Sequence, residues 1–185
     1  NLIYNEESGA LNESLSDIFG KSLEYFVDKE NFSWDLGPEF ALSKFASTFR
    51  SMSDPNMQGN PKRYKGLFWE DGADVHYNSG VLNHWFYLLV EGVTGDSEGI
   101  PYAVNKVDID EVLQVLFLCQ TSYLTPSSDY PAMYEFTMLA CEDLYGAGSH
   151  QYESMQEAWK AVGLPVETNT EDILDLQLST ENFYE

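Results

Sequence analysis

Basic residues are scarce in this chain of 185 residues. Nine Lys and Arg stand against 31 Asp and Glu, which gives a formal net charge of −22 at pH 7. This excess of negative charge repels polyanions, so neither nucleic acid nor an anionic membrane is expected as a partner. No apolar run approaches the roughly 18 residues that a membrane-spanning helix needs. The charge suits a bound cation, a basic substrate or simple solubility, and solubility accounts for most of these acids.

Cysteine is also rare, and strand signals are weak. Cys119 and Cys141 each lie in an apolar stretch of helical periodicity, and neither has the spacing of a metal ligand. Two buried thiols are expected, and a single disulfide between two helices is the alternative. No internal repeat is visible. A hydrophobic content of 43% suits one globular domain with a sizeable core.

Apolar residues recur at helical spacing along most of the chain, so the predicted fold is mainly α, an irregular bundle of about five or six helices. The predicted helices cover residues 10–29, 39–50, 78–91, 108–120, 131–145 and 149–162. Between the second and third of them, residues 51–78 are rich in Gly, Pro, Asn and Asp and are predicted to be irregular. Loops of this length are often functional.

The composition changes near the end of the chain. After Pro165 the sequence contains acidic residues and no Lys or Arg. The expected organisation is therefore one helical domain over residues 1–164 and an acidic C-terminal extension over residues 165–185. Such an extension is a tail, a linker or an interaction segment.

An acidic stripe marks the first predicted helix. Glu13, Asp17, Gly20 and Glu24 are separated by four, three and four residues, so they share one helix face. Like charges four residues apart destabilise a helix, so a buried face of this kind would need compensation. A bound zinc or calcium ion is one possibility, and solvent is the other. Spacing alone favours the solvated face.

Several motifs change that interpretation. The run Ser8–Gly20 is followed in order by five shorter stretches: Phe49–Pro55, Asp71–Gly80, Tyr123–Pro126, Asp143–Gly146 and Ala161–Gly163. Together they resemble the C-terminal helical half of thermolysin-like zinc metallopeptidases, over roughly residues 1–164. The first run resembles the motif that follows the HExxH helix in that family and supplies the third zinc ligand.

The resemblance implies roles for five residues. Glu13 would be the zinc-ligating carboxylate, and Asp17 would hold a ligating His through a hydrogen bond. His76 and Tyr4 would donate hydrogen bonds to the negative charge that develops on the attacked carbonyl oxygen. Asp71 would orient His76 and raise its pKa.

Simpler interpretations stand beside these roles. Without the resemblance, His76 would be a loop histidine that caps the helix predicted to begin near Asn78, and Tyr4 would be a core aromatic. His84 and His150 match no site of the family and are expected to be ordinary helix-surface or core residues.

Two further residues resemble the family's substrate-binding positions. Arg50 matches an arginine that binds a substrate carbonyl near the S1′ pocket, and its simpler role is a buried pair with Asp17 or Asp71. Phe49 stands where family members often carry a smaller aliphatic side chain. A larger ring shrinks the pocket, so the intact enzyme is expected to prefer smaller P1′ residues than its relatives do. Cleavage profiling that shows an unchanged preference for Leu and Phe would count against this prediction.

Calcium ligands are only partly present. Glu24, Asn31 and Asp35 fall where the resemblance implies calcium ligands, but Ser33 and Pro38 replace acids at neighbouring positions. A full double-calcium site is therefore not expected, and one weak calcium site stays open.

The sequence also lacks the HExxH motif and any pair of His four residues apart. The resemblance places that helix just before Asn1. Because catalytic zinc takes three protein ligands and this chain offers one, the isolated chain is expected to bind zinc poorly and to be inactive. The expected function is the C-terminal catalytic half of a secreted zinc endopeptidase that acts on peptides or proteins and needs the missing N-terminal half. The alternatives are a non-catalytic binding or interaction module and, with less support, a metal-free hydrolase that uses Glu13 with Asp71.

Overall fold

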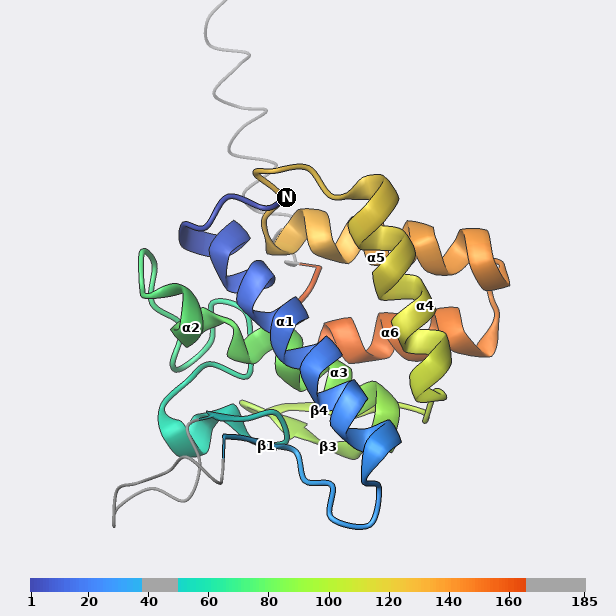
Figure 1. Cartoon of the computed structure of the whole chain (residues 1–185), viewed down its shortest axis with the longest axis horizontal. Coiled ribbons are helices and arrows are strands. Elements are labelled where there is room, and N and C mark those ends of the chain that lie inside the picture. The colour runs from blue at the N-terminus through green and yellow to red at the C-terminus, as the bar shows by residue number, and fades with distance from the viewer. Residues whose placement is uncertain (38–49, 166–185) are drawn as a thin grey trace, which may run out of the picture.

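A computed structural model describes residues 1–37 and 50–165, and Figure 1 shows its arrangement. The described residues form six α-helices, of which α2 is a single turn, and two short antiparallel strand pairs. The helices are α1 (Glu6–Val27), α2 (Val75–Asn78), α3 (Gly80–Glu91), α4 (Ile109–Leu118), α5 (Tyr130–Tyr145) and α6 (His150–Ala161). The strands are β1 (Asp35–Leu36), β2 (Arg50–Ser51), β3 (Thr94–Ser97) and β4 (Ile100–Ala103). The mainly α fold is confirmed.

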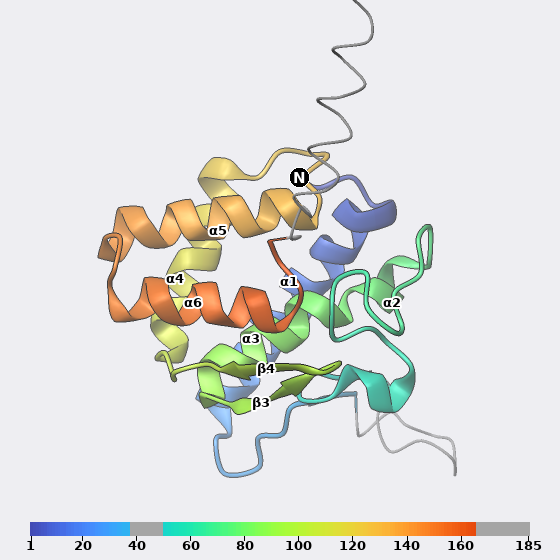
Figure 2. The same ribbon diagram turned by 180° about the vertical axis from the view of Figure 1, so that it is seen from behind.

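The helix α3 lies at the centre of the core because its sequence is apolar on nearly every side. Its fully buried side chains are Val81, Leu82, Trp85, Phe86, Leu88 and Leu89. Figures 1 and 2 show α1 on one side of α3 and α6 on the other. Trp85 packs on Trp159 of α6 with ring centroids 4.8 Å apart, and the Trp159 indole donates to Thr137 of α5 at 2.9 Å. These contacts join three helices into one core.

The long helix α1 buries one face and exposes the other. Its buried apolar residues are Ala10, Leu11, Leu15 and Ile18, which recur at helical spacing. Glu6 and Glu7 lie in its first turn, where acidic side chains stabilise a helix by interacting favourably with its dipole. The acidic stripe that contains Glu13 and Asp17 lies on α1 next to these buried residues. This helix therefore positions the candidate site.

Most predicted helices are found, with shifts of a few residues at their ends. The segment between the helices predicted over residues 78–91 and 108–120 holds an element that the weak strand signals did not predict. It forms the β3–β4 hairpin, whose turn residues Glu98 and Gly99 both have positive φ, at 55° and 87°. Two successive residues of positive φ suit the tight hairpin turn that matches strand twist. The helix predicted over residues 39–50 falls largely outside the described residues, as does the acidic extension beyond Pro165.

The two cysteines are free and buried, as the first of the two alternatives expected. Burial raises the pKa of both thiols to about 12, so neither is a reactive thiolate at neutral pH. Among the residues that the structure describes, no helix combines the length and the apolar character of a membrane span.

His84 is buried in α3, and its Nδ1 lies 3.1 Å from the Met52 carbonyl oxygen. Burial lowers the pKa of His84 to about 4, below its ordinary value of 6.5. At pH values between these two pKa values, His84 binds a proton in the unfolded chain and does not bind it in the folded chain. The free energy of unfolding is therefore expected to fall by roughly 2–3 kcal/mol from pH 7 to pH 4.5 through this residue.

Urea denaturation of the chain and of His84→Asn at both pH values measures this effect. An Asn can still donate to the Met52 carbonyl but does not titrate, and the carboxylates titrate equally in both proteins. The variant should lose less stability than the parent between the two pH values. Parallel losses would show that His84 is not a source of acid sensitivity.

Candidate functional site

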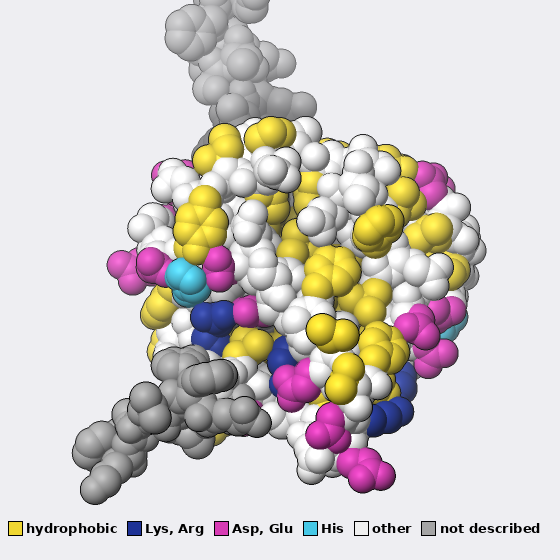
Figure 3. All heavy atoms as spheres, viewed as in Figure 1, with side chains coloured by type: hydrophobic (Ala, Val, Ile, Leu, Met, Phe, Trp, Pro, Cys, Tyr) yellow, Lys and Arg dark blue, Asp and Glu magenta, His cyan; other side chains and the backbone are white. Residues whose placement is uncertain are grey.

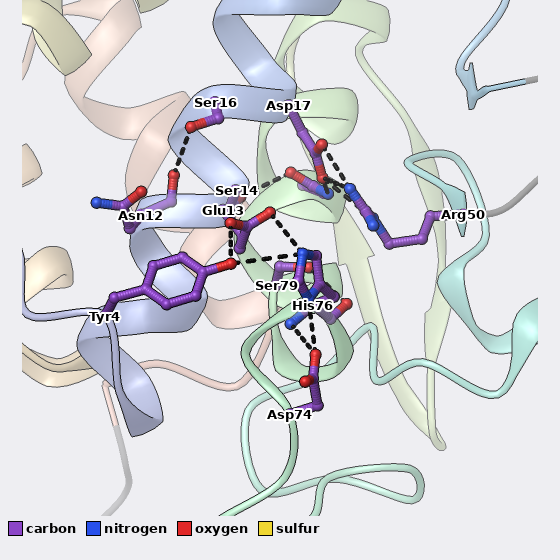
Figure 4. Close-up of polar contacts among 11 residues, drawn as sticks. Tyr4, Asn12, Glu13, Ser14, Ser16, Asp17, Arg50, Asp74, His76 and Ser79 are labelled. Atoms are coloured by element: carbon purple, nitrogen blue, oxygen red, sulfur yellow. Dashed lines mark hydrogen bonds and ion pairs between the residues drawn. The ribbon is translucent and has the colours of Figure 1, made fainter.

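Three segments meet at one end of α1 (Figure 4). Glu13 lies on α1, Tyr4 lies in the segment before it, and His76 lies on α2, which packs against α1. The close approach of the two helices depends on Gly9, since a Cβ at this position would lie 2.4 Å from Val75 Cγ1. The Ser-Gly-Ala opening of α1 therefore places His76 beside Glu13.

The Glu13 carboxylate receives contacts at both oxygens. The Tyr4 hydroxyl donates to Glu13 Oε1 at 2.5 Å, and His76 Nε2 lies 3.2 Å from Glu13 Oε2. The Tyr4 hydroxyl also lies 3.5 Å from His76 Nε2. The Glu13 side chain is 18% exposed and that of His76 is 49% exposed, so the cluster opens to solvent. A tyrosine hydroxyl and an imidazole nitrogen thus converge beside one partly shielded carboxylate.

The hydrogen bond to Glu13 is the main cause that raises the pKa of the Tyr4 phenol. The phenol therefore stays protonated at neutral pH and keeps its donor. The simpler interpretation of Tyr4 as a core aromatic does not describe it, because the side chain is largely exposed.

The partner of the second His76 nitrogen is Asp74. Asp74 Oδ1 lies 2.7 Å from His76 Nδ1 and accepts from the His76 backbone N–H at 3.0 Å, as the N-cap of α2. Its two hydrogen bonds to His76 lower the pKa of Asp74, with the backbone bond first. This ionised carboxylate fixes the orientation of the imidazole and points Nε2 toward Glu13.

The structure thus places Asp74, and not the expected Asp71, beside the His76 ring. Asp71 instead accepts from the Trp69 indole at 2.7 Å. Asp74 takes the contact because an N-cap carboxylate two residues before the histidine already lies beside its ring. The metal-free pair of Glu13 and Asp71 gains no support, since the described partners of the two acids differ and neither acid contacts the other.

The second acid of the stripe, Asp17, is held by a separate network. Arg50 donates to both of its oxygens, with Nη2 at 2.6 Å from Oδ1 and Nε at 3.2 Å from Oδ2. Asn83 Nδ2 donates to Asp17 Oδ2 at 2.9 Å, and the Ser14 hydroxyl donates to Asn83 Oδ1 at 2.7 Å. Arg50 thus pairs with Asp17 rather than Asp71. Neither Glu13 nor Asp17 belongs to a simply solvated face.

Sequence reasoning missed Asn83, although a signal was present. Asn83 is a polar residue inside the apolar helix α3 and is almost fully buried. Buried polar side chains need hydrogen-bond partners, so its position already indicated a network. The partner could not be identified from the chain, because it lies 66 residues away on α1.

The third acid of the stripe, Glu24, accepts from the Lys21 ammonium at 2.6 Å. The same ammonium donates to the main-chain oxygen of Asp35 at 3.1 Å, so a lysine supplies positive charge between two of the expected calcium ligands. Asn31 donates to Asp28 at 2.9 Å. Pro38 lies outside the described residues, as does Phe49, so the S1′ prediction for Phe49 stays a prediction.

The described side chains include one suitable zinc ligand, Glu13. The Glu13 carboxylate is partly shielded and lies between Tyr4 and His76, and a carboxylate oxygen is a suitable zinc ligand. Within residues 1–37 and 50–165, no group of three or more His, Cys, Asp or Glu is placed to hold a metal ion. The described chain therefore fits one ligand of a zinc site and not a complete site.

Comparisons with known proteins found similar sequences and a similar structure. The sequence model described as "Thermolysin metallopeptidase, alpha-helical domain" matches residues 1–164. The thermostable neutral protease NprT of Geobacillus stearothermophilus is 36% identical over 170 residues, covering 88% of this chain and 29% of that protein. A bacillolysin of Brevibacillus brevis is 38% identical over 168 residues, covering 88% of this chain and 30% of that protein.

Among solved structures, the precursor of protealysin, a metalloproteinase from Serratia proteamaculans, superposes with a TM-score of 0.68 and 28% sequence identity. The match covers 88% of this chain and 52% of that chain. The chain thus spans about three tenths of the length of the curated relatives that it matches.

Proposed function

The chain belongs to the thermolysin metallopeptidase family, as its alpha-helical domain, and we propose that it forms the C-terminal catalytic half of a zinc-dependent endopeptidase. The observation that carries this proposal is the convergence of the Tyr4 hydroxyl and His76 Nε2 on the Glu13 carboxylate. These three side chains come from three segments of the chain, the stretch before α1, α1 itself and α2. By the family's kinship with neutral proteases, the parent protein is proposed to be secreted and to act on peptides or proteins.

Glu13 would supply one zinc ligand, and the other two would come from an HExxH segment outside these residues. When bound, zinc would activate a water molecule and polarise the substrate carbonyl. Asp17 would accept a hydrogen bond from a zinc-binding imidazole of that segment. Arg50 and Asn83 support this role, because they hold the Asp17 carboxylate in place on α1.

His76 and Tyr4 would stabilise the negative charge that develops on the substrate carbonyl oxygen. Both donors lie beside Glu13, so both would lie beside a metal that Glu13 holds. Asp74 supports this role, since it holds the far side of the imidazole and leaves Nε2 directed into the cluster. Donors fixed before the reaction stabilise such charge without reorganising.

The missing half is proposed to pack on the outer faces of α1 and α4. Figure 3 shows hydrophobic side chains gathered on this face. A groove there is lined by Phe19 of α1 together with Leu113 and Phe117 of α4, and Phe117 is 63% exposed. A Cβ on Gly20 would meet no atom within 4 Å. A glycine inside a helix destabilises it by roughly 0.5–1 kcal/mol relative to alanine. The absence of a side chain at Gly20 would leave room for a helix of the missing half.

Coordination supports this position. Two imidazoles that share an ion with Glu13 would come from a segment beside α1, and the apolar groove reaches α1 at Phe19, six residues after Glu13. About half of the solved protealysin precursor lies outside its match to this chain, which leaves a segment to provide them.

A non-catalytic interaction module is the second candidate, because none of the 185 residues belongs to an HExxH motif. Zinc titration of this chain alone and of the longer natural product separates the two. The first candidate predicts weak zinc binding by the chain and about one tightly bound zinc per longer product. A longer product without tight zinc would favour the interaction module.

A further inference from the structure

A groove of about 460 Å³ lies where the described chain ends. It runs between the end of α6, the strand β4 and the loop around Tyr64. Three of the chain's nine Lys and Arg line it, namely Arg63, Lys65 and Lys160. In a chain with a net charge of −22, this concentration of basic side chains is unusual. The groove therefore offers an acidic segment a favourable site on an otherwise repulsive surface.

The basic side chains are held in place by the groove itself. Arg63 Nη1 donates to the main-chain oxygens of Lys160 and Ala161, at 3.2 and 3.3 Å, at the end of α6. The Lys65 ammonium lies over the Tyr64 ring, 5.6 Å from its centre. Glu157 pairs with Lys160 at 2.6 Å, and it is the one acid among the described lining residues. The lining thus keeps a positive excess.

Another part of the groove lining is apolar. Ile100, Pro101 and Tyr102 of β4 form it, and Ile100 is 44% exposed. Leu164 and Pro165 line the same groove, so the segment that follows begins inside it. An occupant that matches both parts of the lining needs acidic residues and apolar residues close together.

The sequence after Pro165 has this composition. Residues 166–185 contain six acidic residues and no Lys or Arg. Leu174, Leu176 and Leu178 alternate with polar residues, so an extended chain would present them on one side. The family match ends at residue 164, so this segment is an addition to the family domain.

We propose that residues 166–185 dock in this groove of their own chain, with their acids on its basic side chains and their leucines on the apolar residues of β4. Because the segment begins at Pro165, docking is intramolecular and its effective concentration is on the order of millimolar. The other open cluster sets three carboxylates, Glu13, Asp17 and Asp74, against one arginine, Arg50, so it has no positive excess to attract the same segment. The docking is independent of the peptidase function.

A nitroxide label on Ser179→Cys in the full chain tests the proposal by paramagnetic NMR. Cys119 and Cys141 are buried, so the new thiol is the accessible one. The amide signals of Lys65, Tyr102 and Gly163 should lose more than half of their intensity at low salt, while that of Phe26 keeps it. The loss should largely disappear in 0.5 M salt, since surface ion pairs are screened.

Charge reversal provides the matched comparison. Lys65→Glu with Lys160→Glu should abolish the effect, whereas Lys29→Glu with Lys106→Glu makes the same charge change away from the groove and should preserve it. Three results would each overturn the proposal: uniform intensities, losses centred on Tyr4 and His76, or losses that vanish when the labelled chain is diluted. Unchanged dispersion of the remaining signals verifies that each variant is folded.

Discussion

Replacing Glu13 with Gln in the complete peptidase is expected to release most of its zinc and to lower kcat/KM by roughly a thousandfold. Such a loss corresponds to about 4 kcal/mol, in the range that a metal ion contributes as a Lewis acid. A neutral amide is a poor substitute for a carboxylate ligand, while the side chain keeps its size. The measurements are zinc per protein after gel filtration and the rate of peptide cleavage.

Glu24→Gln is the matched control, because Glu24 lies on the same helix and its carboxylate pairs with Lys21 instead. This variant should keep its zinc and its activity within about a factor of two, as expected for a partly exposed ion pair. A Glu13→Gln enzyme that keeps both would remove Glu13 from the metal site.

Replacing His76 with Ala is expected to lower kcat by roughly 10²–10³ while KM changes little and zinc content stays unchanged. Removing one donor to a developing oxyanion typically has an effect of this size. Tyr4→Phe should give a smaller loss of the same kind. The combination of intact zinc and reduced kcat separates these donors from the ligand Glu13.

The effects of replacing Asp74 and Asp71 should show which of these two acids orients His76. Asp74→Asn should lower kcat by about tenfold, because Asp74 contacts His76 Nδ1 directly. Asp71→Asn should have little effect on kcat, since Asp71 contacts Trp69. If Asp71→Asn is the more damaging change, the assignment of the orienting carboxylate is reversed.

The helices were predictable because their apolar residues recur every three or four positions and bury one face. The hairpin was not, because Thr94–Ser97 contains no large apolar residue and shows no alternation. The turn has positive φ at Glu98 and Gly99. A glutamate is not a residue from which a positive φ, and hence this turn, can be predicted.

The candidate site was predictable where it depends on one helix and less so where it depends on packing. The shared face of Glu13 and Asp17 follows from their spacing. Their partners do not, because Asn83 reaches Asp17 through the packing of α3 on α1. Asp74 was overlooked for a local reason, since the cap of a one-turn helix is hard to recognise before that helix is known.

The central claim is one bond between Glu13 and zinc. X-ray diffraction from crystals of the complete protein, with anomalous data at the zinc edge, tests it most directly. The account predicts a zinc peak with a Glu13 carboxylate oxygen about 2.0–2.2 Å away, and His76 and Tyr4 on the same side of the ion. A zinc ion whose protein ligands exclude Glu13, or a Glu13 side chain turned away from it, would contradict the account.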